Sequence, residues 1–159
     1  QLAANSISIL NKIGFKKKYK EQADKIGFAL HEQILGALQE NEKLAGVKMQ
    51  SPFFVGYISY FVSTGFIAQG VPSEQLDKYL KYICDGVLPG RLWEIYSSQL
   101  KAVEQVQALG GEPLEDFEKG GDVGMWDGFN LITWDESASR ANLKSYLLGQ
   151  ELDYLEPKV

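Results

Sequence analysis

Residues 49–73, MQSPFFVGYISYFVSTGFIAQGVPS, form a run of 25 residues without a formal charge, and this stretch decides the fold. Ser51 and Pro52 signal a helix start, because a serine side chain caps a first turn and proline suits the first helical position. The apolar and aromatic residues that follow occur on every side of such a helix, a pattern typical of a buried helix. We therefore predict a central helix over residues 51–68, surrounded by other helices.

The same stretch is too short and too polar for a membrane span. A transmembrane helix needs about 20 mainly apolar residues. Residues 52–68 number 17, and seven of them are Gly, Ser, Thr or Tyr. A packed core helix is the better interpretation, so no membrane span is expected. The hydroxyls of Tyr57 and Tyr60 then need partners or a wet cleft, which leaves a pocket as an alternative.

Helical periodicity extends to both sides of the central helix. Apolar residues recur every three or four positions in five further segments, which end at Gly, Asn or Pro signals. These predicted helices cover residues 5–13, 17–44, 72–86, 91–109 and 137–148. A chain of 159 residues can bury one core without metals or disulfides. The sequence thus predicts a single all-α domain, 1–159, with five or six helices and with frayed ends at 1–4 and 151–159.

Residues 111–134 depart from this helical pattern. Residues 112–130 contain Pro113, six acids and four glycines. This density of turn-forming residues predicts a long acidic, glycine-rich loop near 111–134, in which residues 129–134 could form a short strand. The aromatic residues of the segment argue against disorder, and loops of this length in compact domains are commonly functional.

The charge of the chain is uneven. The net charge is -5, yet residues 1–50 carry +3 and residues 111–159 carry -7. The lysine-rich start contains no arginine and few aromatic residues, and the overall acidity opposes binding to a polyanion. Nucleic acid is therefore not the expected partner.

Familiar catalytic and metal-binding patterns are missing from the sequence. With one cysteine, Cys84, and one histidine, His31, the chain cannot form an intrachain disulfide or a usual zinc site. It contains no nucleophile elbow, no phosphate-binding loop and no zinc-protease motif. The spacing of Asp122, Asp127 and Asn130 does not match a calcium loop. We expect no cofactor and no metal.

Acids that bracket large aromatic residues are typical of a protein interface, where the aromatic residues supply area and the acids steer a basic partner. We therefore expect a non-catalytic protein-binding module, of an inhibitor or immunity type, for a protein partner with a basic surface. The candidate partner-binding residues are Glu115, Asp116, Phe117, Asp122, Trp126, Asp127 and Trp134.

Two other functions stay open. Tyr57 and Tyr60 could line a pocket in a domain that binds a small molecule or lipid. Loop carboxylates could serve a hydrolase, since sugar hydrolysis uses paired acids. The candidate acids are Asp122, Asp127, Asp135 and Glu136. The sequence indicates neither the compartment nor the oligomeric state.

Within residues 56–82 one further pattern stands out. It consists of Gly56-Tyr57-Ile58, the run GVPSEQL over residues 70–76, and a helix that reaches Tyr82. This pattern resembles the small helical immunity proteins that block a secreted cell-wall amidase. The resemblance implies a compact periplasmic helical protein with an inhibitory role. The chain departs from that family by lacking paired cysteines.

Overall fold

The computed structural model describes residues 19–87, 92–108, 111–131 and 142–153. Over these ranges the chain forms six α-helices and no strand, which confirms the predicted all-α class. The helices are α2 (Lys20–Lys48), α3 (Pro52–Ala68), α4 (Leu76–Tyr82), α5 (Leu92–Gln107), α6 (Glu112–Asn130) and α7 (Asn142–Leu147). A 3-10 turn over Ser73–Gln75 precedes α4, and a π-helical turn over Ile83–Val87 follows it. The predicted helix over residues 5–13 lies outside the described ranges.

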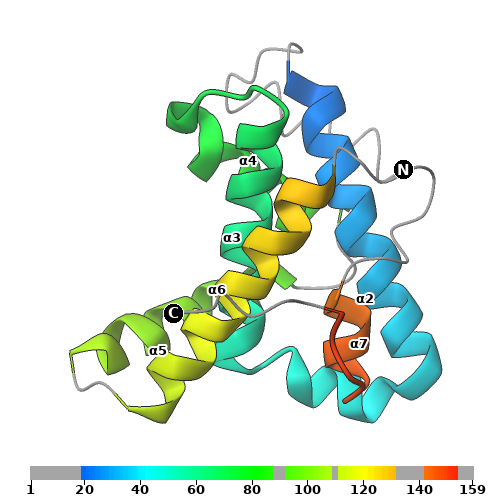
Figure 1. Ribbon diagram of the computed structural model, residues 1–159, viewed down its shortest axis with the longest axis vertical. Coiled ribbons are helices and arrows are strands. Elements are labelled where there is room, and N and C mark those ends of the chain that lie inside the picture. Colours follow the sequence, from blue (N-terminus) through cyan, green and yellow to red (C-terminus); the bar gives the residue numbers. More distant parts are fainter. Residues whose placement is uncertain (1–18, 88–91, 109–110, 132–141, 154–159) are drawn as a thin grey trace.

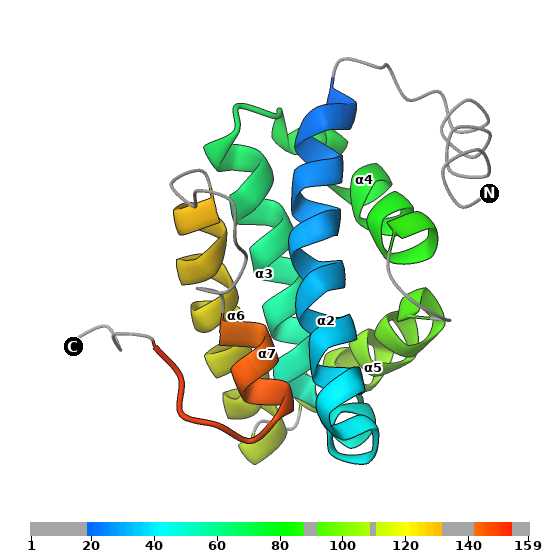
Figure 2. The same cartoon turned by 90° about the vertical axis from the view of Figure 1, so that its right-hand side faces the viewer.

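Helix α3 is central, as the uncharged stretch predicts. The Ser51 hydroxyl accepts a hydrogen bond from the Phe54 N–H at 3.3 Å, and Pro52 occupies the first turn. Most residues of α3 are buried. Figure 2 shows α3 behind α2, with α6 on one side and α4 and α5 on the other. The core therefore forms around this helix.

Helix α2 is interrupted at Asn41, where φ is -154° and ψ is 83°. The Asn41 side-chain oxygen accepts a hydrogen bond from the Leu44 N–H at 3.2 Å and so starts a second helical segment that reaches Lys48. The helix predicted over residues 17–44 thus contains a kink at Asn41, and the helical segment extends to Lys48. In the described part of the chain no single helix is long and apolar enough to cross a membrane. Among the described helices, the pair α2 and α3 together has that length and apolar composition, but the two helices are bent by 107° relative to each other.

The prediction of a loop over residues 111–134 is wrong where the structure describes it, because residues 112–130 form helix α6. Pro113 lies in the first turn, where proline removes no helical hydrogen bond. Glu112 and Glu115 also lie in the first turn, where the helix dipole favours negative charge. The strand predicted at 129–134 is wrong for residues 129 and 130, which end α6.

The glycines of α6 form the face that packs against α3. A Cβ added at Gly120 would overlap the main chain of Phe53, and one added at Gly124 would overlap that of Tyr57. The two helices run side by side in the same direction, as Figure 1 shows for α3 and α6. A glycine costs about 1 kcal/mol relative to alanine inside a helix, and close packing offsets that cost. Glycines that suggest a loop in the sequence are contact residues in the structure.

Candidate functional site

The face of α6 that points away from α3 carries exposed acids and exposed aromatic side chains. Trp126 is 40% exposed and Phe129 is 51% exposed. The exposed acids Asp122, Glu118 and Glu115 lie about one, two and three turns before Trp126 in the helix. We call Glu115, Glu118, Asp122, Trp126 and Phe129 the α6 ridge.

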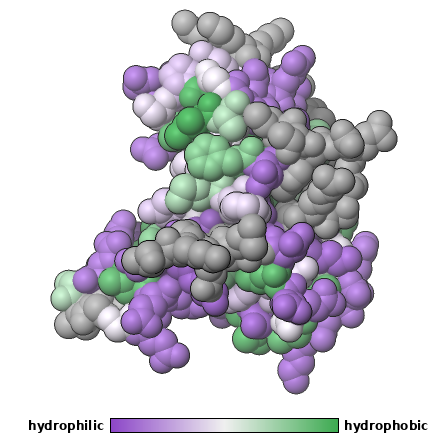
Figure 3. Space-filling model, in the orientation of Figure 1, coloured by the Kyte–Doolittle hydropathy of each residue, from purple (hydrophilic) through white to green (hydrophobic). Residues whose placement is uncertain are grey.

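The α6 ridge changes in character along its length. Its first half is acidic, and its second half, which holds Trp126 and Phe129, is aromatic. Figure 3 shows hydrophilic residues around the lower end of α6 and apolar residues over the upper part of the α3–α6 pair. The ridge therefore offers a partner both charge and apolar contact area on one helix.

The inner acids of α6 have structural partners. The Asp116 carboxylate accepts a hydrogen bond from the Phe53 N–H at 3.2 Å, so it caps the start of α3 from the neighbouring helix. Phe117 is half-buried and packs edge to face against Tyr60, with ring centroids 6.4 Å apart. Asp116 and Phe117, both predicted to bind a partner, thus hold α6 to α3.

The ends of α3 and α6 enclose a shallow, open hollow of about 530 Å³. Its lining residues are Pro52, Glu112, Pro113, Glu115, Asp116 and Lys119. Lys119 is the one basic residue of α6, and it reduces the negative charge at this end. The hollow continues the acidic half of the α6 ridge rather than forming a closed pocket.

Asp127 lies in the core, contrary to the prediction that it contacts a partner. Its side chain is 1% exposed. One carboxylate oxygen accepts hydrogen bonds from the Tyr57 hydroxyl at 2.5 Å and from the Asn142 N–H at 2.6 Å. The other accepts from the Asn142 side-chain amide at 2.9 Å. A buried carboxylate needs such donors, so its role is structural.

The core environment changes the acidity of both members of the short hydrogen bond. Burial raises the pKa of Asp127 to about 6, although the hydrogen bonds from Tyr57 and Asn142 act in the opposite direction. Burial, followed by the negative charge of Asp127, raises the pKa of Tyr57 well above its ordinary value. Tyr57 therefore remains a neutral donor to Asp127.

The two tyrosines of the alternative pocket lie in different surroundings. Tyr57 is fully buried and bonded to Asp127, whereas Tyr60 is 42% exposed. The Tyr60 ring lies against Gly121, where an added Cβ would come within 2.8 Å of a ring carbon. The structure therefore gives no support to a pocket that both side chains line.

The carboxylates of the hydrolase alternative are also separated. Asp122 is exposed on the α6 ridge, while Asp127 points into the core.

Burial, with a smaller contribution from Asp85, raises the pKa of the buried Cys84 thiol to about 12, so this thiol stays protonated at neutral pH. Trp134, Asp135 and Glu136 lie outside the described residues. The part of the chain that is described holds no group of three or more metal-ligating side chains.

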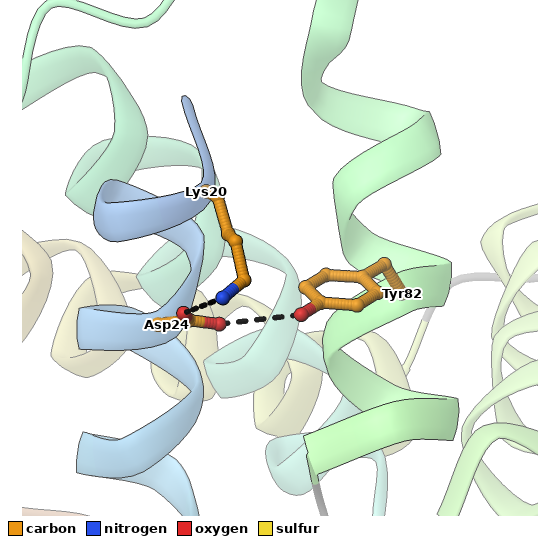
Figure 4. Close-up of polar contacts among 3 residues, drawn as sticks. All are labelled: Lys20, Asp24 and Tyr82. Atoms are coloured by element: carbon orange, nitrogen blue, oxygen red, sulfur yellow. Dashed lines mark hydrogen bonds and ion pairs between the residues drawn. The ribbon is translucent and has the colours of Figure 1, made fainter. Parts of the chain in front are cut away.

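A separate group of polar contacts, away from Asp127, joins α2 to α4 (Figure 4). The Tyr82 hydroxyl donates a hydrogen bond to Asp24 at 3.2 Å, and the Lys20 ammonium lies 3.6 Å from the other Asp24 oxygen. Burial, followed by the Asp24 charge, raises the pKa of Tyr82 to about 12. Tyr82 is buried, so this contact fixes α4 on α2 rather than forming a site.

Sequence reasoning missed the helix that organises the ridge, although a signal was present. Gly120, Gly124 and Gly128 recur every four residues, which places them on one face of a helix. Asn142, which bonds to both oxygens of Asp127, carries no comparable signal because it lies 15 residues further along the chain. Once the segment is treated as a helix, Glu118 and Phe129 can be placed on the same face as the other residues of the ridge.

Comparison with protein-family models, curated proteins and solved structures finds no significant match to this chain. Conclusions about its function therefore rest on the geometry and chemistry of its own residues.

Proposed function

We propose that the protein is a non-catalytic protein-binding module that binds a basic protein partner through the α6 ridge. The observation that carries this proposal is the exposure of Trp126 and Phe129 beside carboxylates on a single helix. Exposed tryptophan supplies a large contact area at a low cost in conformational entropy, and it is enriched among the residues that dominate binding.

The acidic half of the ridge gives the partner its expected charge. Glu115, Glu118 and Asp122 are exposed, and Lys119 is the single basic residue on the helix. Exposed carboxylates in this number accelerate the approach of a positively charged surface, and salt weakens the effect. A basic partner is thus favoured over an acidic one.

The way α6 is held supports binding with little rearrangement. Its inner face is fixed by the glycine contacts with α3, and Asp116 and Asp127 bond to groups on neighbouring helices. A surface that is already ordered loses less entropy when a partner binds. The sequence resemblance favours an inhibitor or immunity type of binding module, in which the ridge would cover a functional surface of the partner.

Replacement of the aromatic anchor tests this function. We expect Trp126→Ala to weaken binding at least tenfold to a purified partner first recovered with the wild-type protein, because a central aromatic anchor contributes about 2 kcal/mol or more. Isothermal titration calorimetry measures the affinity. The matched control is Phe28→Ala, which removes an aromatic side chain that is 60% exposed on α2. Equal affinities for wild type and Trp126→Ala would refute binding through the ridge.

A further inference from the structure

Four segments of the chain meet at the Asp127 carboxylate. Tyr57 comes from α3, Asp127 from α6, Asn142 from α7, and Asp153 from the segment that follows α7. The Asn142 amide donates to the Asp153 carbonyl at 3.0 Å and accepts from the Asp153 N–H at 2.6 Å. Asn142 therefore ties the buried carboxylate to the main chain of the returning C-terminal segment.

Side chains from other helices also hold the rest of α7. The Lys144 N–H donates to the Gln33 side chain at 2.8 Å, which links α7 to α2. The Tyr146 hydroxyl is hydrogen-bonded to Ser51 at 2.6 Å, and its ring stacks on Phe53 with centroids 3.8 Å apart. A helix of six residues is not stable in isolation. Helix α7 thus exists because of these contacts.

We propose that residues 142–153 form a C-terminal latch, which opens separately from the α3–α6 pair and takes up a proton at Asp127 when it closes. The proposal does not depend on the function assigned to the α6 ridge. Its basis is the geometry of the cluster, because Asn142 of the latch supplies donors to both oxygens of a carboxylate that is 1% exposed. Opening would remove those donors and return the carboxylate to water.

The groups that face Asp127 determine the direction of the proton coupling. Helix α3 presents the neutral Tyr57 hydroxyl, and α7 presents the neutral Asn142 amide. The returning segment presents Asp153, whose negative charge opposes ionisation of Asp127. The charge of Lys144 is directed to Glu40 on α2, 3.1 Å away. No cation is therefore among the groups that contact the carboxylate in the described chain.

The closed latch binds the proton more tightly than the open latch. The pKa of Asp127 is about 6 when it is buried, against an ordinary value of 3.8. A group with a raised pKa in the closed state favours closure at low pH and loses that contribution as the pH rises through 6. With these values the closing equilibrium strengthens about tenfold between pH 7 and pH 5.

Amide hydrogen exchange of the intact protein tests the latch directly. The reporters are the amides of Leu148, Gly149 and Gln150, which bond to carbonyls inside the latch. We expect their opening equilibrium, corrected for the intrinsic exchange rate, to exceed that of the α3 amides. We also expect it to fall about tenfold between pH 7 and pH 5. The proposal would be overturned if the latch amides and the α3 amides exchange through one common opening. It would also be overturned if the opening of the latch does not change with pH.

A variant and a direct titration identify the proton site. In Asp127→Asn the pH dependence of latch exchange should disappear, and its persistence would assign the effect to another group. The amide introduced there faces the Asn142 donors and weakens the closed latch, so a measurement on the wild-type protein is also needed. Carbon NMR of the wild-type protein then tests the proposal, because the Asp127 carboxyl should titrate near pH 6. Titration of Asp127 near its ordinary value of 3.8 would contradict the proposal.

Discussion

Three neutral donors hold the Asp127 carboxylate in the core. They are the Tyr57 hydroxyl, the Asn142 N–H and the Asn142 side-chain amide. Hydrogen bonds favour the charged form of an acid, whereas loss of water disfavours it. At Asp127 the loss of water has the larger effect, which explains why the pKa rises to about 6.

Removal of one donor should change both stability and acidity. We expect Tyr57→Phe to lower the free energy of unfolding by about 1–3 kcal/mol, because it leaves a buried carboxylate with fewer partners. It should also raise the pKa of Asp127 above 6, since the Tyr57 hydrogen bond lowers that pKa. Urea unfolding and NMR titration measure the two effects.

The control for this variant lies one turn away on the same helix. Tyr60 is 42% exposed, so Tyr60→Phe should change the unfolding free energy by less than about 0.5 kcal/mol. Equal losses in the two variants would show that the Tyr57 hydroxyl contributes nothing specific to the core.

Single residues in this core could not be assigned from the sequence. Asp127 lies in an acidic segment, and the composition of that segment suggests a surface position for its residues. Its partners Tyr57 and Asn142 are 70 and 15 residues away along the chain. Only the arrangement of α3, α6 and α7 brings these groups together, and local patterns do not contain that arrangement.

At the scale of the element, the sequence predicts α3 correctly and α6 wrongly. The Ser51-Pro52 start and the uncharged aromatic run correctly predict α3. The glycines and Pro113 that suggest a loop belong instead to α6. Local propensity disfavours glycine in a helix, but tertiary packing overrides it where a second helix approaches closely. The kind of element was therefore predictable only where local and tertiary preferences agree.

Adding a methyl group to the α3–α6 contact should destabilise the protein. A Cβ at Gly124 would overlap the main chain of Tyr57, which cannot move as easily as a side chain. We expect Gly124→Ala to lower the free energy of unfolding by about 1–3 kcal/mol or more. Chemical denaturation measures the change.

The chain contains a matched control for this substitution. Gly46 lies in α2 with nothing within 4 Å of an added Cβ. Gly46→Ala should therefore raise the free energy of unfolding by about 0.5–1 kcal/mol, since alanine favours the helix. A stabilising Gly124→Ala variant would mean that the glycine face is not in close contact with α3.

At the scale of the whole molecule, the fold separates the acidic residues of α6 into an exposed group and a buried or half-buried group. Four of the six acids in α6 are exposed, namely Glu112, Glu115, Glu118 and Asp122. Asp116 and Asp127 are turned inward, where they bond to α3 and α7. The outward acids lie on the same helix as Trp126 and Phe129. This separation gives the molecule one face suited to a basic partner.

The rate at which a basic partner associates tests this face most directly. Stopped-flow mixing with the purified partner compares wild type with the triple variant Glu115→Gln, Glu118→Gln and Asp122→Asn at about 50 and 500 mM salt. The control carries the same change in charge on α2, as Glu21→Gln, Glu32→Gln and Glu42→Gln. Steering by the ridge predicts about tenfold slower association for the ridge variant at low salt, with rates that converge at high salt. Equal rates and equal salt dependence for all three proteins would contradict the assignment of the α6 ridge as the binding face.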